Sequence, residues 1–306
     1  MQAFLREKEA NANAGEVSVG RLYAVKLHLD YFRDWFGKDR NVEEIDGQAL
    51  SRYRLDLLEK TASDAWTRTT AWHYLTTVKS FVRWLWTTEV IETLPRILAK
   101  KPSPLTITIS PRKIVVFTKE EITSLLTAPD RAKLYILLML NCGMTQKDIA
   151  DLADAEVDWD EGRIKRKRSK TGDCDNVPTV DYKLWPETLR LLRQERAQES
   201  SELVLLNANG SPLWTEQITA AGKYQKTDNV KNAFDRLRKT LGIKKPLKSL
   251  KKTSASLLRN NERFSNLENL FLGHAPQKMS DQHYAQVPQD LLDLAVRWLG
   301  DEYGLA

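Results

Sequence analysis

The sequence predicts a mainly α-helical protein of two domains, with a small β-sheet in the second domain. The chain of 306 residues is longer than most single domains. Apolar residues recur with the spacing of amphipathic helices throughout residues 1–98. By contrast, residues 156–170 alternate on both sides of an Asp-Glu-Gly turn, which is the pattern of a β-hairpin. We therefore expect an all-helical domain at 1–98, a linker at 99–113 and an α+β domain at 114–306.

The first domain is predicted from three helical segments. Leu22, Val25, Leu29 and Phe32 lie on one face of a helix, and the pattern returns in residues 45–58 and 75–85. Five of the nine tryptophans of the chain belong to this part. Large aromatic side chains fill the core of a small helical domain, so we interpret most of these tryptophans as core residues.

A polar and basic set of side chains occupies the last of these helical segments, in residues 63–86. Such side chains contact phosphates when a helix lies along DNA, and an ordinary solvated helix face is the equally simple alternative. We expect DNA contacts from Arg68, His73 and Lys79, accompanied by Thr69, Thr70, Thr76 and Thr77.

The linker at 99–113 contains three prolines and four basic residues. Proline-rich composition favours an extended, semi-rigid connection, and the basic residues suit a protein that closes around a polyanion. Residues 106–110 also alternate well enough to form a strand.

Two helix starts are predicted early in the second domain. Thr118 is followed three residues later by Glu121, which is the spacing of a capping box, and we expect helices at 119–127 and 131–142. Thr145 is followed in the same way by Asp148, so a further helix is expected to begin there.

The predicted hairpin is strongly basic. Residues 163–170 contain six basic side chains in eight positions: Arg163, Lys165, Arg166, Lys167, Arg168 and Lys170. A charged edge strand that resists aggregation is the structural alternative. Because the run has one sign of charge, contact with DNA is the favoured interpretation.

Further elements follow the hairpin. We expect a strand at 177–180, a helix that begins near Pro186, a short strand at 204–206 and helices at 229–241 and 289–300. Residues 243–258 combine an apolar helix face with a second basic cluster, which favours contact with phosphates. This cluster consists of Lys244, Lys245, Lys248, Lys251 and Lys252.

Composition limits the kind of protein. The formal net charge is +6, which is compatible with a nucleic-acid partner. Cys142 and Cys174 show neither a disulfide framework nor metal-ligand spacing, so we expect the protein to be located in the reducing cytoplasm. The polar N-terminus is no signal peptide, and the longest apolar run is too short to span a membrane.

A histidine and a tyrosine stand close together near the end of the chain. Residues 272–288 read LGHAPQKMSDQHYAQVP, in which Gly273 suits a left-handed helix cap and Pro276 prevents continuation of the helix. Tyr284 follows His274 by ten residues. The tyrosine hydroxyl could attack an electrophile to which the histidine donates a hydrogen bond. Alternatively, His274 caps a helix and Tyr284 packs in the core.

Leu272-Gly273-His274 followed by Tyr284 resembles the C-terminal signature of the tyrosine recombinase, or phage integrase, family. The resemblance implies a SAM-like core-binding domain at 1–98, which clamps DNA, and a catalytic domain at 114–306. It also implies that Tyr284 is the nucleophile, that His274 donates a hydrogen bond to the phosphate and that Lys170 protonates the leaving 5′ oxygen.

Three positions depart from the pattern of this family, so its catalytic set is degenerate here. Aligned on Gly143 and Asp148, the first arginine that clamps the scissile phosphate is replaced by Thr145. The family's histidine and second arginine are replaced by Lys248 and Lys251. Lysine keeps the positive charge but loses the planar fork that matches two phosphate oxygens.

Two functions are therefore expected. The first is site-specific recombination or integration, in which DNA strands are cut and rejoined through a 3′-phosphotyrosine at Tyr284, as in mobile genetic elements. The second is a protein of the same fold that binds DNA without cutting it, or cuts it very poorly. In either case we expect double-stranded DNA as partner, assembly as a dimer or tetramer on it, and no cofactor. The sequence shows no Gly-rich phosphate loop, nucleophile elbow or metal motif that would favour a small-molecule enzyme.

Overall fold

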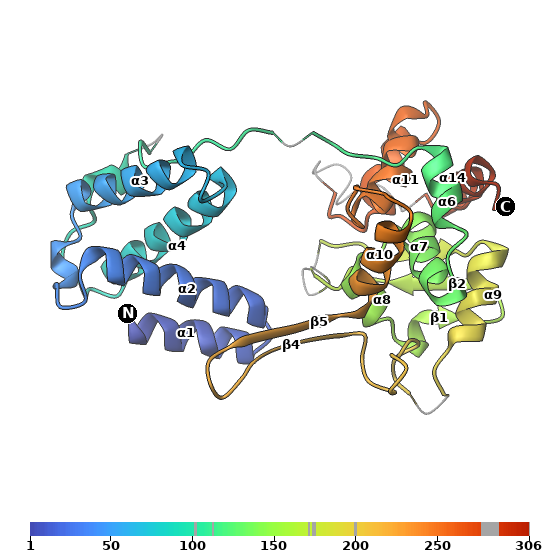
Figure 1. The fold of residues 1–306 in the computed structure, drawn as a ribbon, viewed down its shortest axis with the longest axis horizontal. Coiled ribbons are helices and arrows are strands. Elements are labelled where there is room, and N and C mark those ends of the chain that lie inside the picture. The colour runs from blue at the N-terminus through green and yellow to red at the C-terminus, as the bar shows by residue number, and fades with distance from the viewer. Residues whose placement is uncertain are drawn as a thin grey trace. The chain divides into compact units, whose positions relative to one another are not determined.

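The computed structural model describes residues 1–100, 103–111, 113–170, 172, 176–198, 201–276 and 288–305 (Figure 1). The chain divides into two compact units. The first consists of Met1–Arg112 together with Glu216–Gln225, and the second of Lys113–Thr215 and Lys226–Ala306. Both units are mainly helical, as the sequence predicts.

The first unit is built from four long helices and a short one: α1 (Gln2–Asn13), α2 (Val19–Phe36), α3 (Gly47–Ala62), α4 (Arg68–Thr87) and α5 (Arg96–Ala99). Polar residues fix three of the helix starts: the side chains of Ser18, Asp46 and Thr67 each accept a hydrogen bond from a backbone N–H in the first turn. The apolar faces predicted for these segments are buried together in one core.

Most of the tryptophans of this unit pack against its core, as predicted. Trp35, Trp66, Trp72 and Trp84 pack against the core, whereas Trp86 is 46% exposed. Trp86 therefore lies outside the core, and no contact in the described residues explains its position.

The first part of the predicted linker packs on the first unit. Leu105 and Ile107 are buried in its core. The Arg54 guanidinium donates to the Thr106 carbonyl at 2.6 Å, and the Lys79 ammonium donates to the Leu105 carbonyl at 2.8 Å. Side chains satisfy these carbonyls, and residues 106–110 are not a strand.

The second unit begins with α6 (Lys119–Leu125), α7 (Asp130–Cys142) and α8 (Gln146–Ala150). The capping boxes predicted at Thr118 and Thr145 are both present. After the sheet come α9 (Pro186–Glu195), α10 (Asn229–Thr240), α11 (Ser249–Asn260), α12 (Glu268–Phe271) and α14 (Gln289–Tyr303). The residues of α7 from Leu134 to Cys142 are all buried, because α9, α10, α11 and α14 pack against the helix.

The sheet of the second unit has the order β1-β2-β3 and is antiparallel: β1 (Val157–Asp158), β2 (Arg163–Arg166) and β3 (Val180–Lys183). Ile164 stands opposite Val157 on one side and Tyr182 on the other, which places its side chain in the core. Gly162 has a φ of +62°, as the turn between β1 and β2 requires. The predicted hairpin is confirmed, while the strand expected at 177–180 begins only at its last residue.

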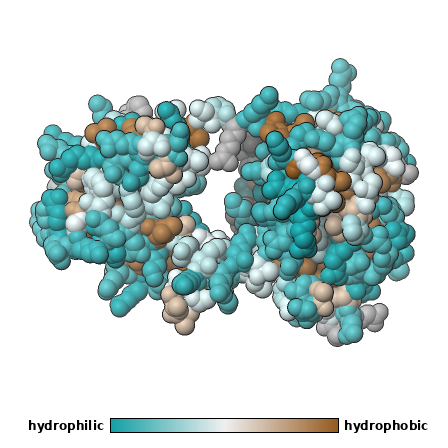
Figure 2. Space-filling model, viewed as in Figure 1, coloured by the Kyte–Doolittle hydropathy of each residue, from teal (hydrophilic) through white to brown (hydrophobic). Residues whose placement is uncertain are grey.

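A second hairpin was not predicted. It consists of β4 (Trp214–Ile218) and β5 (Tyr224–Asp228), and its tip at Glu216–Gln225 belongs to the first unit. There the ring of Tyr224 stacks on that of Tyr23 at 5.1 Å between centroids. Figure 2 shows that hydrophilic residues cover most of the visible surface. None of the helices in the described part of the chain has the length and apolar character needed to cross a membrane.

Candidate functional site

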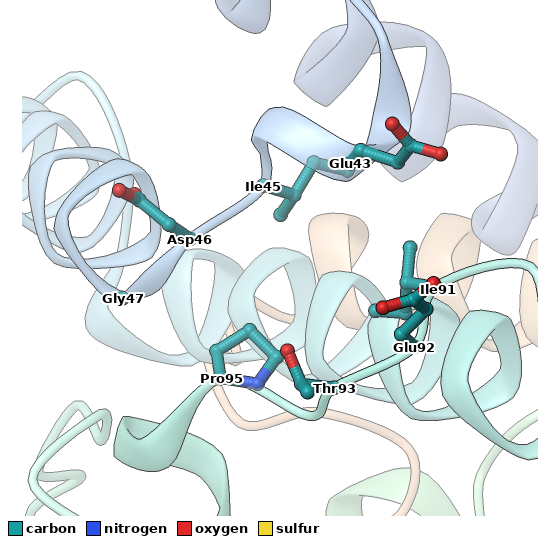
Figure 3. A pocket seen from close by; sticks show the side chains of 8 residues that line it. All are labelled: Glu43, Ile45, Asp46, Gly47, Ile91, Glu92, Thr93 and Pro95. Atoms are coloured by element: carbon teal, nitrogen blue, oxygen red, sulfur yellow. The ribbon is translucent and has the colours of Figure 1, made fainter.

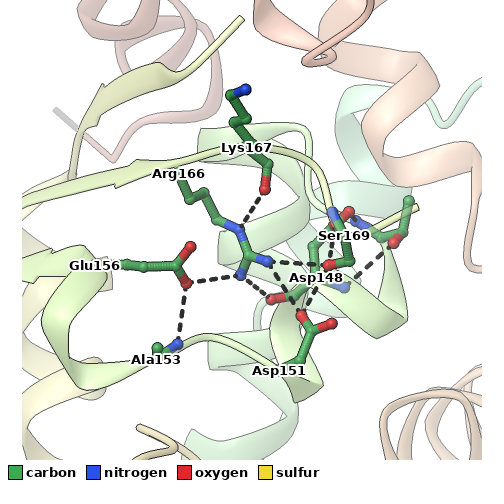
Figure 4. A network of polar contacts seen from close by, with 8 residues as sticks. Asp148, Asp151, Ala153, Glu156, Arg166, Lys167 and Ser169 are labelled. Atoms are coloured by element: carbon green, nitrogen blue, oxygen red, sulfur yellow. Dashed lines mark hydrogen bonds and ion pairs between the residues drawn. The ribbon is translucent and has the colours of Figure 1, made fainter. Parts of the chain in front are cut away.

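Asp148 joins the start of α8 to the segment that follows β2 (Figure 4). One carboxylate oxygen accepts the Thr145 backbone N–H at 2.7 Å, and the Thr145 hydroxyl accepts the Asp148 N–H in return. The other carboxylate oxygen accepts both the N–H and the hydroxyl of Ser169, at 2.9 and 2.7 Å. Burial alone would raise the pKa of Asp148, but these hydrogen bonds lower it below its ordinary value. Asp148 is therefore a buried anion that fixes two loops.

Arg166 completes this network from β2. Its side chain is only 6% exposed, and its guanidinium donates to the Asp148 carbonyl, to Asp151 at 3.1 Å and to Ser169 at 2.9 Å. Glu156 lies 3.5 Å from the same group. We expected a DNA contact from Arg166, but its donors are already used inside the protein (Figure 4).

Arg163 is engaged in a similar way at the other end of β2. It donates to Asp181 at 2.7 Å and forms a two-pronged pair with Asp293 at 2.8 and 2.9 Å. Hydrogen bonds to Asp293 raise the pKa of Arg163 above its usual value. The pair ties β2 to α14, so the structure gives Arg163 a structural role in place of the expected DNA contact.

The remaining basic side chains of the hairpin are available to a ligand. Lys165, Lys167 and Lys170 are exposed, and their ammonium groups form no ion pair with any described residue. They retain the character that the sequence predicts for a surface that binds phosphates.

His274 is positioned by the end of α12. Gly273 has a φ of +60° and donates to the Leu270 carbonyl, while the His274 N–H donates to the Asn269 carbonyl at 2.9 Å. This pair of bonds is a Schellman cap, so the left-handed cap predicted at Gly273 is confirmed.

The same helix end is held by two other elements. The Phe271 carbonyl accepts a hydrogen bond from the Tyr182 hydroxyl on β3, at 2.9 Å. Gly143, which ends α7 with a φ of +59°, lies so close that a Cβ there would be 2.6 Å from this carbonyl oxygen. The end of α7, the sheet and the end of α12 thus converge beside His274.

Three basic side chains come together at this point. Lys251 on α11 is partly buried, and burial, reinforced by the charge of Arg168, lowers its pKa to about 8. Burial also lowers the pKa of His274, with contributions from the charges of Arg168 and Lys251. A positive charge that lowers the pKa of a neighbouring base lies within electrostatic range of it. We call Arg168, Lys251 and His274 the cationic cluster; it is an arrangement suited to an anion.

The other lysines of α11 and the segment before it differ in their surroundings. Lys245 forms a 2.5 Å ion pair with Glu121, so its charge is already balanced. Lys244 and Lys248 are exposed, and Lys252 is partly exposed. Of the two lysines expected to replace the family's clamp, only Lys251 belongs to the cationic cluster.

The polar set of α4 is divided by the structure. Arg68 and His73 are exposed and stay available for DNA. Thr77 is buried and pairs with His28 at 2.8 Å, and Lys79 holds the Leu105 carbonyl. Lys79 was expected to contact DNA, but its ammonium group serves the packing of residues 103–107.

A hollow of about 410 Å³ in the first unit has the acidic side chains of Glu43, Asp46 and Glu92 in its lining. Figure 3 shows Glu43 and Glu92 at its edges, and Asp46, which caps α3. Carboxylates repel phosphate, so this hollow is no candidate for a DNA backbone.

Tyr284, the predicted nucleophile, lies outside the described residues. The sequence also missed the partners of Asp148. The only local signal was its place in the capping box, since Ser169 and Arg166 reach it from positions far along the chain.

A family model for the phage integrase family matches residues 115–290. Among solved structures, a lambda integrase dimer bound to a COC′ core site is 15% identical, with a TM-score of 0.64 over 94% of this chain and 96% of that chain. A Tn1549 transposon integrase in complex with a circular intermediate DNA is 13% identical, with a TM-score of 0.58 over 96% and 97%. A lambda integrase tetramer bound to a Holliday junction is 15% identical, with a TM-score of 0.62 over 94% and 79%. No curated protein sequence matches the chain significantly.

Proposed function

Because the chain belongs to the phage integrase family, we propose that it binds double-stranded DNA and breaks and rejoins its strands through a 3′-phosphotyrosyl bond at Tyr284. The observation that carries this proposal is the cationic cluster. His274 and Lys251 stand in one partly buried site, each with a pKa lowered by burial and by a neighbouring positive charge. Perturbed basic groups held together by a rigid scaffold are typical of a site that stabilises a charged transition state.

The proposed reaction has two steps. The Tyr284 oxygen attacks the phosphorus and its hydroxyl proton passes to solvent, while the bond to the 5′ oxygen breaks and Lys170 gives the leaving oxygen a proton. During this step His274 and Lys251 stabilise the negative charge on the phosphate oxygens. Rejoining is the reverse: a 5′ hydroxyl attacks the phosphotyrosine and returns its proton to Lys170, and the Tyr284 oxygen leaves and takes a proton from solvent.

The alternative function, binding without cleavage, has its own supporting observation. The Thr145 hydroxyl and N–H are both used in the capping box with Asp148, and the residue carries no charge. Thr145 therefore supplies neither the positive charge nor the guanidinium donors of a clamp arginine. Loss of one pre-organised donor to a transition state typically lowers the rate by ~10²–10³. Cleavage by this protein is therefore expected to be slow unless another group compensates.

We also propose that the protein acts as a dimer or tetramer on DNA. The solved lambda integrase structures are a dimer on a core site and a tetramer on a Holliday junction. Exposed Lys165, Lys167, Lys244 and Lys248 in the second unit, with Arg68 and His73 in the first, would contact the phosphates.

The test is capture of the covalent intermediate. A nicked duplex that carries the DNA flanking the protein's own gene is incubated with the full chain and run on a denaturing gel. A covalent band that disappears with Tyr284→Phe supports strand cleavage. DNA retardation at low salt without any covalent band would establish the non-cutting alternative instead. Arg236→Ala, on the exposed part of α10, is the control for loss of a positive charge elsewhere.

A further inference from the structure

The cationic cluster contains an arginine with no assigned partner. The Nε atom of Arg168 is buried and has no hydrogen-bond partner among the described residues. The residue also forms no ion pair there, in contrast to Arg163 and Arg166 on the same hairpin. The residue as a whole is partly exposed, so its guanidinium is partly desolvated, and no counter-charge in the described part of the chain offsets that cost. The arrangement is therefore one that a bound anion would stabilise.

The position of Arg168 connects it to the candidate site on two sides. A Cβ on Gly273 would be 3.4 Å from the Arg168 Cβ, so the side chain starts directly beside the residue that precedes His274. Arg168 also lines a small hollow of about 20 Å³ with Gly143 and Met144, which immediately precede Thr145. Arg168 thus lies next to the turn in which the uncharged Thr145 stands.

The backbone around Arg168 is fixed by the Asp148 network. Ser169, the next residue, gives both its N–H and its hydroxyl to the Asp148 carboxylate. Arg166, two residues earlier, is held by the Asp148 carbonyl and by Asp151. Catalytic donors need this kind of support, since a donor that must be ordered during the reaction contributes less.

Charge gives the third argument. The charge of Arg168 lowers the pKa of both Lys251 and His274, whereas the Asp148 carboxylate acts in the opposite direction on Lys251. The Asp148 oxygens already accept hydrogen bonds from Thr145 and Ser169. Without a ligand the cluster therefore has more positive than negative charge, and binding of a phosphate would relieve the repulsion.

We propose that Arg168 provides a phosphate-binding guanidinium at the cleavage site, in place of the charge that Thr145 does not supply. The inference rests on the proposed strand cleavage for its catalytic meaning. In this role Arg168 contacts the scissile phosphate from the exit of β2, together with Lys251 and His274. Its planar fork can bind two phosphate oxygens, which neither lysine nor histidine can do.

The first arm of the test measures the rate of covalent complex formation on the nicked duplex. Arg168→Gln keeps most of the side-chain volume, Arg168→Lys keeps the charge, and Arg236→Gln, at an exposed arginine of α10 outside the site, is the matched control. We expect Arg168→Gln to lower the rate by ~10² or more, Arg168→Lys to recover part of it, and Arg236→Gln to change it less than about threefold. If Arg168→Gln forms the covalent complex at a rate within about threefold of the wild type, the inference is overturned and the proposed function still stands.

The second arm does not depend on cleavage. Inorganic phosphate is titrated into the full-length variants, and the dissociation constant is obtained from the shift in thermal midpoint. We expect Arg168→Gln to weaken phosphate binding at least about tenfold, with Arg236→Gln unchanged. If the wild type forms no covalent complex, the proposed function fails, and this titration alone decides whether Arg168 binds phosphate. Equal phosphate affinity in Arg168→Gln and the wild type would refute it.

Discussion

Replacement of Gly143 by alanine tests whether the close approach of α7 to α12 supports the site. The residue has a φ of +59°, and an added Cβ would lie 2.6 Å from the Phe271 carbonyl oxygen and 3.1 Å from its ring. Left-handed backbone costs an L-residue about 1–2 kcal/mol. The contact adds a further ~1–3 kcal/mol, because a packed backbone carbonyl has to move. We therefore expect Gly143→Ala to lower the free energy of unfolding by about 2–5 kcal/mol.

Gly242→Ala is the matched control. Gly242 ends α10 with a φ of +68°, and nothing lies within 4 Å of the position of an added Cβ. This variant carries the backbone cost without the contact, so its loss should be about 1–2 kcal/mol. The difference between the two variants isolates the effect of the close approach.

The assay is urea unfolding of the full chain, with hydrogen exchange of α7 peptides to assign the transition to the second unit. Because Phe271 lies two residues before Gly273 and three before His274, Gly143→Ala should also reduce covalent complex formation. Equal losses of stability in the two variants, within about 0.5 kcal/mol, would show that the contact with Phe271 does not restrain the site.

Three further predictions follow from titratable groups. Burial, assisted by the charges of Arg21 and His73, lowers the pKa of His28 from its ordinary value of 6.5 to about 4. Between these two pH values the unfolded chain therefore binds more protons than the folded chain. Stability of the first unit should therefore fall as pH drops from about 6.5 to about 4, by up to ~3 kcal/mol, and His28→Gln should flatten the pH profile of the thermal midpoint. Lys251 must be protonated to bind phosphate, so phosphate affinity should fall as pH rises through about 8, by at most tenfold per pH unit. Lys251→Arg should show no such fall in the same titration, because arginine stays protonated. Asp148→Asn should lower the free energy of unfolding in urea by about 2–4 kcal/mol, since an amide cannot replace both acceptor oxygens. The control Asp235→Asn, at a surface ion pair, should lower it by less than about 1 kcal/mol. Equal losses in the two variants would show that the buried network does not stabilise the fold.

The local features of this protein were determined by the sequence itself. The capping boxes at Thr118 and Thr145 and the glycine cap at Gly273 depend on groups within five residues of one another. The helix faces depend on a repeat that is visible in the chain. Such features were predicted correctly because their interactions are short in sequence. The β4–β5 hairpin was missed because its residues, which include Thr215, Gln217, Gln225 and Lys226, lack the apolar alternation of an ordinary strand.

The role of each basic residue was decided only by the tertiary structure. Residues 163–170 carry six positive charges, and the sequence does not show which of them are paired inside the protein and which are free to bind a ligand. Folding brings Asp181 and Asp293 to Arg163 and places Arg166 against Asp148 and Asp151, but leaves Arg168 without a carboxylate partner among the described residues. The partners come from elements distant in sequence, and a buried charge takes its role from the groups that replace its water. For that reason the basic character of the site could be predicted from the chain, whereas the charge available to a phosphate could not.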